Sequence, residues 1–353
     1  MSSHATDTTP DSDYSIIILI GDFLLDVIME KVEGRNQTPL MEFLLLGFGD
    51  VHELQPLFFL LFLLIYLVTV TANALIVVLV VIDRHLQTPM YIFLGNLAFL
   101  GICFSSTIVP MMLASLLTGD RSVSVKGCMA QVYFFGVMST TESLLLFIMS
   151  YDRYLAICNP LHYAALMNGR VCGQLVAGSW VISFLCCTVV DIFFFQLTFC
   201  DSKEIDHFFC DFTPMLKLAC GDTQIVQLLA FAVALLFTFV TCLLILTSYA
   251  CIITAILRIP STTGRKKAFS TCSSHLIAVT IFYGISFTVY VVPLVNTAEV
   301  PKKVFSVFCT VLTHMINPVI YCLRNKEVKE SLRKAVFMQL AVRNCHRIRK
   351  QKF

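Results

Sequence analysis

The sequence predicts an all-α membrane protein, a bundle of seven transmembrane helices followed by a short amphipathic eighth helix. Hydrophobic residues fill 57% of the 353 positions and charged residues only 14%, and the mean hydropathy of +0.81 is too high for a soluble chain of this length. Seven apolar segments are each long enough, at about 20 residues, to cross about 30 Å of hydrocarbon. Because these segments are continuously apolar instead of alternating, we expect helices and not the strands of a membrane barrel.

The predicted spans, helix 1 to helix 7, cover most of the chain between residues 56 and 322. Their ranges are 56–82, 89–117, 128–157, 171–197, 223–257, 267–293 and 304–322. The chain therefore divides into an extracellular segment over 1–55, a seven-helix domain over 56–322, and a cytoplasmic eighth helix with a basic tail over 323–353. Residues 1–28 form an atypical extension. Its apolar stretch contains Asp22 and Asp26 and follows no basic residue, so it does not fit a secretory signal peptide, and Met29 is an alternative start.

The distribution of Lys and Arg predicts the orientation. An odd number of spans places the two termini on opposite faces, and cytoplasmic loops carry an excess of basic residues. With the amino terminus outside, eight basic residues face outward and seventeen of the 25 face inward, ten of them from Arg324 onward. We expect a multi-pass plasma-membrane protein with its carboxyl terminus in the cytoplasm. The basic tail suits the anionic lipid of the inner leaflet, and Cys345 within it is a candidate for palmitoylation.

Four of the 15 cysteines lie where oxidation is expected. Cys128 stands at the outer end of helix 3, and three others lie in the long loop between helices 4 and 5, namely Cys200, Cys210 and Cys220. Four cysteines allow three pairings, and the sequence alone does not choose among them. Most of the other cysteines lie within spans and fit small apolar packing residues.

One glycosylation signal lies on the outer side. Asn36-Gln37-Thr38 is the only N-x-[ST] acceptor in the chain, so we expect N-glycosylation at Asn36, although Pro39 weakens the signal.

Asp152 and Arg153 end the third span, in the run Met149-Ser-Tyr-Asp-Arg-Tyr-Leu-Ala-Ile-Cys158. A charge inside or at the rim of a membrane helix is costly, so an adjacent acid and base there is a functional-site hypothesis by default. We interpret the pair as a switch.

Helices 6 and 7 carry two further polar features. Pro318 lacks a backbone donor and kinks helix 7, and we expect Asn317 to satisfy the freed groups, in either a hinge or a static kink. His275, two turns into helix 6, is either a satisfied core histidine or a polar latch between helices at the cytoplasmic end. The preceding Arg265, Lys266 and Lys267 fit anchors to anionic lipid.

Six motifs occur in a characteristic order. They are LQTPMYIFLGNLAFL from Leu86, MSYDRYLAIC with the following NPLHY, EIDHFFCD from Glu204, Ser248-Tyr249, KAFSTCSSH from Lys267, and NPVIY followed by LRNKEVK. Together they resemble the vertebrate olfactory receptors, which are rhodopsin-like G-protein-coupled receptors. The resemblance runs from about residue 36 to residue 334, and a joint match of this kind is very specific.

The resemblance implies two disulfides, Cys128 with Cys210 and Cys200 with Cys220. It implies that Asp152 holds Arg153 at rest and that activation releases Arg153 to meet Tyr249 and the G protein. The other implied members of the switch are Tyr154, His275, Asn317, Pro318 and Tyr321. The implied function is an odorant receptor that activates a stimulatory, olfactory-type heterotrimeric G protein and raises cyclic AMP, with no enzyme activity, cofactor or nucleic-acid partner.

The chain departs from the resembling family in the middle of the bundle. Gly101 stands where a membrane-embedded aspartate is usual, and Glu142 of helix 3 is left without that partner, although Asn73 of helix 1 is present. Resembling receptors hold a sodium ion between the two acids, so we expect weakened or absent sodium sensitivity and no other metal site. The alternative is that water and Asn317 compensate.

We expect the ligand pocket between helices 3, 5, 6 and 7, beneath the loop that carries the outer cysteines. Helical spacing gives an inward face of helix 3, with two positions beside it: Phe135, Ser139, Glu142 and Ser143, then Gly136 and Thr140. Similarity adds Phe237, Tyr283, Ser286, Phe287, Tyr290 and Thr310. Such walls suit a small apolar or moderately polar molecule, and a charged amine lacks its usual counter-ion on helix 3. Each aromatic residue alone also fits ordinary helix packing.

Three other classes of protein are less consistent with the sequence. A transporter or channel would favour several intramembrane charges, whereas the buried candidates are Glu142 and Asp191. A retinal-binding photoreceptor needs a lysine that helix 7 lacks. The spans contain no HExxH, GxSxG or clustered Asp/His pair of an enzyme. A non-functional relic of the family is disfavoured because the frame retains every helix.

Overall fold

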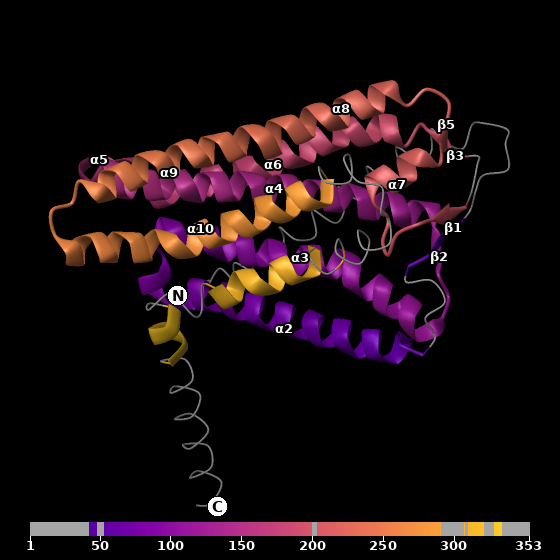
Figure 1. The fold of residues 1–353 in the computed structure, drawn as a ribbon, viewed down its shortest axis with the longest axis horizontal. Coiled ribbons are helices and arrows are strands. Elements are labelled where there is room, and N and C mark those ends of the chain that lie inside the picture. Colours follow the sequence, from indigo (N-terminus) through magenta and orange to yellow (C-terminus); the bar gives the residue numbers. More distant parts are fainter. Residues whose placement is uncertain are drawn as a thin grey trace, which may run out of the picture.

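The computed structural model describes residues 42–47, 53–199, 203–290, 307, 310–320 and 328–333. Long helices lie side by side, with the short strands gathered at one end of the bundle and the short helix α5 (Pro160–Leu166) at the other (Figure 1). Cys128 and Cys210 belong to the end with the strands, and Asp152 and Arg153 lie near α5. The two ends therefore carry the features that the sequence assigned to opposite faces of a membrane.

The described helices match the predicted spans closely. They are α2 (Gln55–Ile82), α3 (Pro89–Thr118), α4 (Val125–Cys158), α6 (Gly169–Phe194), the continuous run α8 (Gln224–Ala234), η2 (Leu235–Val240) and α9 (Thr241–Leu257), and α10 (Thr262–Tyr290). Five of these are long and apolar enough to cross a membrane, and α10 passes the same test as a bent pair. The described part of the seventh predicted span is helical over Thr310–Ile320.

Several predicted ends differ from the structure by a few residues, and two of them show the cause. The helix of span 6 begins at Thr262, five residues before the predicted start, so the basic residues Arg265 to Lys267 lie inside its first turns. The helix of span 4 ends at Phe194 instead of residue 197, because the chain turns there to enter β3 (Thr198–Phe199). Hydropathy locates the apolar stretch, but local turns set where a helix begins and ends.

Local sequence explains the start of α4 and the end of α3. The Ser124 side chain accepts a hydrogen bond from the Gly127 amide at 3.1 Å and so caps the first turn of α4. Gly119 ends α3 with a positive φ of 74°, a conformation that glycine adopts without strain. The short elements between the long helices are η1 (Arg84–Leu86), β2 (Ser122–Ser124), α5 and α7 (Phe212–Lys217).

α4 is the central helix of the bundle. In the most apolar stretch of α4, 67% of the residues are buried inside the protein. In the most apolar stretch of Gln224–Leu257 the buried share is only 17%, and the exposed leucines and phenylalanines of that run suit contact with lipid. α4 packs against α3, α6, α9 and α10. Side chains on α4 are therefore placed to connect most of the other helices.

A small sheet covers the outer end of the bundle. β1 (Glu42–Leu45) is its central strand, pairing antiparallel with β2 and parallel with β4 (Glu204–Ile205). Alternation along β1 buries Phe43 and Leu45 and exposes their neighbours. A second pair joins β3 to β5 (Ala219–Cys220). Residues from three distant parts of the chain thus form one cover.

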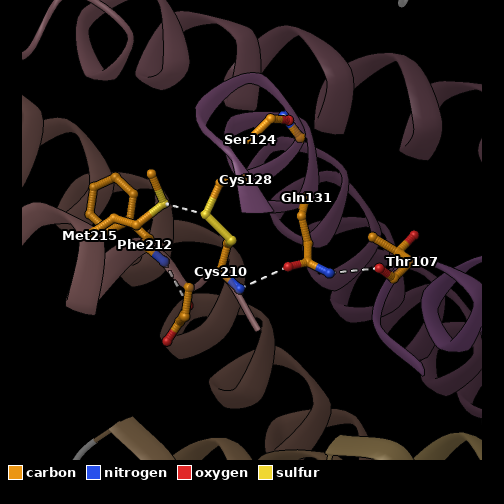
Figure 2. Close-up of a disulfide and its surroundings, with 9 residues drawn as sticks. Thr107, Ser124, Cys128, Gln131, Cys210, Phe212 and Met215 are labelled. Atoms are coloured by element: carbon orange, nitrogen blue, oxygen red, sulfur yellow. Dashed lines mark hydrogen bonds between the residues drawn. A yellow bond between two sulfur atoms is a disulfide. The ribbon is translucent and has the colours of Figure 1, made fainter. Parts of the chain in front are cut away.

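A disulfide between Cys128 and Cys210 ties the first turn of α4 to this cover (Figure 2). It is one of the two pairings that the resemblance implied. The sulfur of Met215 on α7 lies 3.6 Å from the Cys128 sulfur, and all three residues are buried. Cys220 is also disulfide-bonded, but Cys200 lies outside the described residues.

Gln131, one turn below Cys128, bridges three elements through one amide. Its Nε2 donates to the Thr107 carbonyl of α3 at 2.7 Å, and its Oε1 accepts from the Cys210 amide at 2.7 Å (Figure 2). Thr107 lies one turn before Pro110, which interrupts the backbone hydrogen bonds of α3. No sequence motif marks Gln131, because both of its partners are backbone groups.

We predict that Gln131→Leu lowers the apparent melting temperature of the purified protein. The substitution leaves the buried Cys210 amide without its acceptor, which costs about 1–3 kcal/mol, and it also removes the hydrogen bond to the Thr107 carbonyl. The matched control is Gln227→Leu, since Gln227 is exposed and its amide bonds only to Thr223, at 2.9 Å. Equal melting temperatures for the two variants would contradict the bridging role.

Candidate functional site

Asp152 is the centre of a charged cluster near the carboxyl-terminal end of α4, the end that the sequence predicts to be cytoplasmic. It is fully buried, and its Oδ2 accepts from Arg153 through Nη2 at 2.5 Å and Nε at 3.0 Å. Its Oδ1 accepts from the Tyr163 hydroxyl of α5 at 2.8 Å. A buried carboxylate is tolerated only when it is paired and hydrogen-bonded, and these three donors meet that condition. Asp152, Arg153 and Tyr163 are called the cytoplasmic lock below.

Tyr163 is the member of the lock that sequence reasoning missed. It lies within the quoted NPLHY run, but only the short helix α5 brings its hydroxyl back to Asp152. Burial, and secondly the negative charge of Asp152, raise the pKa of Tyr163 above its usual range. The hydroxyl therefore keeps its proton and remains a donor throughout the physiological pH range.

A second polar contact joins α4, α9 and α10 one to two turns further into the bundle. The Tyr249 hydroxyl lies 2.6 Å from Nδ1 of His275, and Nε2 of His275 lies 3.1 Å from the Leu146 carbonyl. The carbonyl can only accept, so the tautomer that satisfies both contacts carries its proton on Nε2 and accepts from Tyr249 on Nδ1. Both ring nitrogens of the buried His275 are thus satisfied, and the contacts link three helices, so the geometry fits a satisfied core histidine as well as a latch between helices.

Two other predicted members of the switch are Tyr154 and Tyr321. Tyr154 is half-buried, with its ring stacked 6.3 Å from that of Tyr151, and does not bond to Asp152 or Arg153. Tyr321 lies outside the described residues. In the structure Arg153 pairs with Asp152, which is the pairing that the resemblance implies for the resting state, and Tyr249 pairs with His275.

The backbone carbonyl that Pro318 leaves without a donor has a different partner from the one we predicted. Pro318 removes the backbone donor that would bond to the His314 carbonyl four residues earlier. That carbonyl accepts from Nδ2 of Asn73 on α2 at 3.0 Å. Asn317 instead donates to Oε1 of Glu142 at 3.5 Å. The expectation that Asn317 serves the freed group is therefore wrong, because a neighbouring helix places another amide closer to it.

Gly101 leaves room for this arrangement. A Cβ at this position would lie 3.3 Å from both Nδ2 and Oδ1 of Asn73, which is closer than ordinary van der Waals contact. The amide of Asn73 therefore lies against Gly101, at the position where resembling receptors carry an aspartate. Glu142 is left with the side chain of Asn317 as its hydrogen-bond partner among the described residues.

Aromatic rings line the region beneath the outer cover. Phe135 of α4 stacks on Phe209 of the loop at 5.5 Å and packs against Phe104 of α3 at 4.9 Å, and Phe104 contacts His314 at 4.2 Å. These contacts connect the disulfide-bonded loop with helix 7. Phe135 thus occupies the inner position that the spacing on helix 3 predicted.

Tyr283 joins α10 to the π-helical turn η2. The Thr241 hydroxyl donates to the Phe237 carbonyl at 2.5 Å, which leaves its oxygen to accept from the Tyr283 hydroxyl at 2.8 Å. Phe237 is itself buried. Thr241 was not predicted, since a π-helical turn is not visible in the sequence.

Several predicted pocket positions are half-buried or buried. Ser143 donates to the Ser139 carbonyl at 3.1 Å and Ser286 to the Phe282 carbonyl at 2.9 Å, so each hydroxyl is satisfied within its own helix. Thr310 is half-buried, and the side chain of Tyr290 lies outside the described part of the structure.

Three predicted pocket positions need correction. A Cβ at Gly136 would lie 3.5 Å from Sγ of Cys187, and the Thr140 hydroxyl is 3.9 Å from the same sulfur, so both positions face α6. They are four residues apart and share one stripe of α4, which is rotated away from the stripe of Phe135 and Ser139. Phe287 is 59% exposed and does not point into the described bundle.

Comparisons with known proteins agree with the fold and the motifs. The family profile described as "Olfactory receptor" matches residues 62–339. The chain belongs to the olfactory receptor family. Human olfactory receptor 10A5 is 47% identical over 311 residues, covering 88% of this chain and 98% of that receptor. Mouse olfactory receptor 5AP2 is 46% identical over 306 residues, covering 86% and 96%. Human olfactory receptor 10A2 is 47% identical over 293 residues, covering 83% and 97%.

Membership of this family decides between the classes of protein considered above. An olfactory receptor is a seven-helix, multi-pass membrane protein that responds to odorants through a G protein, and it is not an enzyme. The prediction of fold class from composition and hydropathy is therefore confirmed.

We predict that Tyr163→Phe raises the ligand-independent activity of the receptor. Loss of one hydrogen bond to the Asp152 carboxylate weakens the restraint on Arg153 by about 1.5 kcal/mol, roughly tenfold in the equilibrium between the resting and active states. Basal nucleotide exchange on a co-expressed G protein measures the effect. Tyr151→Phe is the control, since Tyr151 is exposed on the same helix.

The pH dependence of the lock gives a further check on the same variant. When folding raises the pKa of a group, the hydrogen bond of its protonated form is fully present below the pKa of the unfolded state. That hydrogen bond is lost only when the pH rises through the pKa of the folded state. Because the pKa of Tyr163 is raised, basal activity should not change through this group between about pH 6 and 9. A basal activity of Tyr163→Phe equal to that of Tyr151→Phe would exclude Tyr163 from the lock.

Proposed function

We propose that the receptor binds a small apolar or moderately polar odorant within the helix bundle and activates a stimulatory, olfactory-type heterotrimeric G protein, raising cyclic AMP. The observation that carries this proposal is the cytoplasmic lock, in which Arg153 is held by a fully buried acid at the rim of the membrane region. A restrained charge of this kind is a two-state element whose balance a ligand shifts by binding one state better.

The surface beside the lock suits a protein partner. Leu161 is 93% exposed and lies on α5, the same short helix that places Tyr163 against Asp152. The neighbouring Leu166 is 47% exposed. These apolar side chains favour docking of the G protein against α5, next to the group that the lock restrains.

The proposed odorant site lies beneath the disulfide-bonded loop. Phe135, Phe209, Phe104 and Tyr283 supply aromatic walls, and hydroxyls such as that of Ser139 supply a few hydrogen bonds. Walls of this kind favour a compact apolar molecule oriented by one or two polar contacts.

The proposed orientation places the amino terminus outside and the carboxyl terminus in the cytoplasm. The disulfide and the small sheet lie together at one end, which suits an oxidising exterior, and the excess of Lys and Arg lies on the other side. The division at residues 1–55, 56–322 and 323–353 follows from this orientation. Glycosylation of Asn36, palmitoylation of Cys345 and lipid binding by the tail belong to the same proposal, and these residues lie outside the described ranges.

A cyclic-AMP reporter tests the proposed coupling. In cells that carry the olfactory-type stimulatory G protein, an odorant panel should raise the signal for the wild type and fail to do so for Arg153→Ala at equal surface expression. Arg170→Ala is the control, because Arg170 is exposed in the first turn of α6. An unaffected Arg153→Ala response, or ion flux without a G protein, would contradict the proposal.

The replacement of the usual aspartate by Gly101 predicts a receptor that is insensitive to sodium. Replacing sodium by an organic cation should leave the half-maximal agonist concentration unchanged, because Glu142 alone lacks the second carboxylate of a sodium site. Gly101→Asp should introduce a sodium-dependent shift, whereas Gly101→Ala, which places the same Cβ against Asn73 without a carboxylate, should not. A large sodium effect in the wild type would overturn this reading.

A further inference from the structure

Asp191 is a buried acid that the receptor mechanism does not use. It lies on α6, three residues before the helix ends at Phe194, and is 5% exposed. Its backbone carbonyl accepts from the Phe195 amide at 2.8 Å, but its carboxylate forms no hydrogen bond or ion pair within the part of the chain that the structure describes. An intramembrane acid without a partner is costly, which makes it a candidate functional group.

Polar side chains of α4 and α6 meet on the face of α6 that carries Asp191. The Tyr133 hydroxyl lies 3.0 Å from Oγ1 of Thr188, and Thr188 precedes Asp191 by three residues on the same face of α6. Tyr133 and Asp191 are both buried. Asp191 therefore lies on the side of α6 that packs against α4 and not on its lipid-facing side.

The position of this cluster matches the level of the proposed odorant site. Tyr133 lies five residues after Cys128, so the cluster lies just beneath the disulfide-bonded loop. Aromatic rings flank it, since the Tyr133 ring lies 5.3 Å from that of Phe134 and 6.4 Å from that of Phe184. A polar group of a small molecule would therefore meet the acid while its apolar part packs on these rings.

We propose that Asp191, with the hydroxyls of Tyr133 and Thr188, forms a subsite between α4 and α6 that binds the ammonium group of a small amine. An ammonium group has three donors, one for the carboxylate and two for the hydroxyl oxygens, which keep free lone pairs beside their mutual hydrogen bond. The counter-ion that helix 3 lacks is thereby supplied by helix 4. This subsite deepens the proposed odorant-binding function and rests on it.

An opposite charge explains why a carboxylate is retained here. Tyr133 and Thr188 hydrogen-bond to each other, and neither hydroxyl bonds to the Asp191 carboxylate within the described part of the chain, so their contact does not depend on the acid. A bound cation offsets the cost of removing the carboxylate from water. No group in the described chain supplies such an opposite charge to Asp191. The ligand-free Asp191→Asn receptor should therefore be at least as heat-stable as the wild type, the reverse of what loss of a structural contact gives.

Thermal stability of the purified full-length receptor in lipid nanodiscs tests the subsite without relying on signalling. The probes are 2-phenylethylamine and its neutral isostere 2-phenylethanol, with butylamine and cyclohexylamine and their alcohols as smaller pairs. The amines should raise the melting temperature of the wild type more than the alcohols do. In Asp191→Asn the apparent affinity for the amines should fall about tenfold to a hundredfold, the range for loss of a charge-assisted hydrogen bond.

Matched variants separate the subsite from general effects of charge and folding. Asp206→Asn, an exposed acid in the outer loop, should keep the amine response. Thr188→Val should weaken amine binding by less than Asp191→Asn, and it tests the site even if Asp191→Asn fails to fold. Equal stabilisation by amine and alcohol in the wild type, or equal amine binding in Asp191→Asn and the wild type, overturns the subsite.

The cyclic-AMP reporter keeps this test separate from that of the proposed function. Activation by neutral odorants but no amine binding overturns the subsite and leaves the receptor function intact. Amine binding that depends on Asp191, with no cyclic-AMP response to any agonist, supports the subsite and overturns the proposed coupling.

Discussion

The structure depends on one constraint, which is that hydrocarbon offers no hydrogen-bond partners to a polar group. Each polar side chain buried in the bundle must therefore bond to another part of the chain, and α4 uses this requirement at three levels. Gln131 bonds to α3 and the outer loop, Glu142 to Asn317 of helix 7, and Asp152 to α5. These side chains act as cross-links that hold neighbouring elements in register around the central helix.

The same constraint explains how the proline of helix 7 is accommodated. The sequence states which backbone donor is missing, and so which carbonyl is freed, but it does not state which helix lies beside that carbonyl. Asn73 reaches it from α2, and Gly101 permits the approach because it has no side chain. An aspartate at this position would have to displace the amide. The loss of the usual acid and the direct contact between α2 and helix 7 are therefore two aspects of one local rearrangement.

Most of the fold was predictable because it rests on hydropathy and length, which are properties of single segments. The described helices agree with the predicted spans, and deviations of a few residues occur where a turn or strand takes over, as at Phe194. The functional site was less predictable, because its decisive contacts join distant segments. Tyr163 and Gln131 bond to groups 11 and 79 residues away, and no local pattern marks either one. Helical spacing correctly placed Phe135, but it could not assign the adjacent stripe of Gly136 and Thr140 to α6.

Asp191 is informative because it departs from the rule that the other acids follow. Asp152 and Glu142 find donors within the described chain, and Asp191 does not. A partner from outside the described chain, such as the proposed ammonium group, supplies the opposite charge that this carboxylate lacks. An ammonium group bound there contacts α6 through the carboxylate and α4 through Tyr133, and α4 carries Arg153 at its other end. A ligand can shift the lock only if it binds the two states with different affinity. A contact that depends on the spacing between α4 and α6 meets this requirement where release of Arg153 alters that spacing.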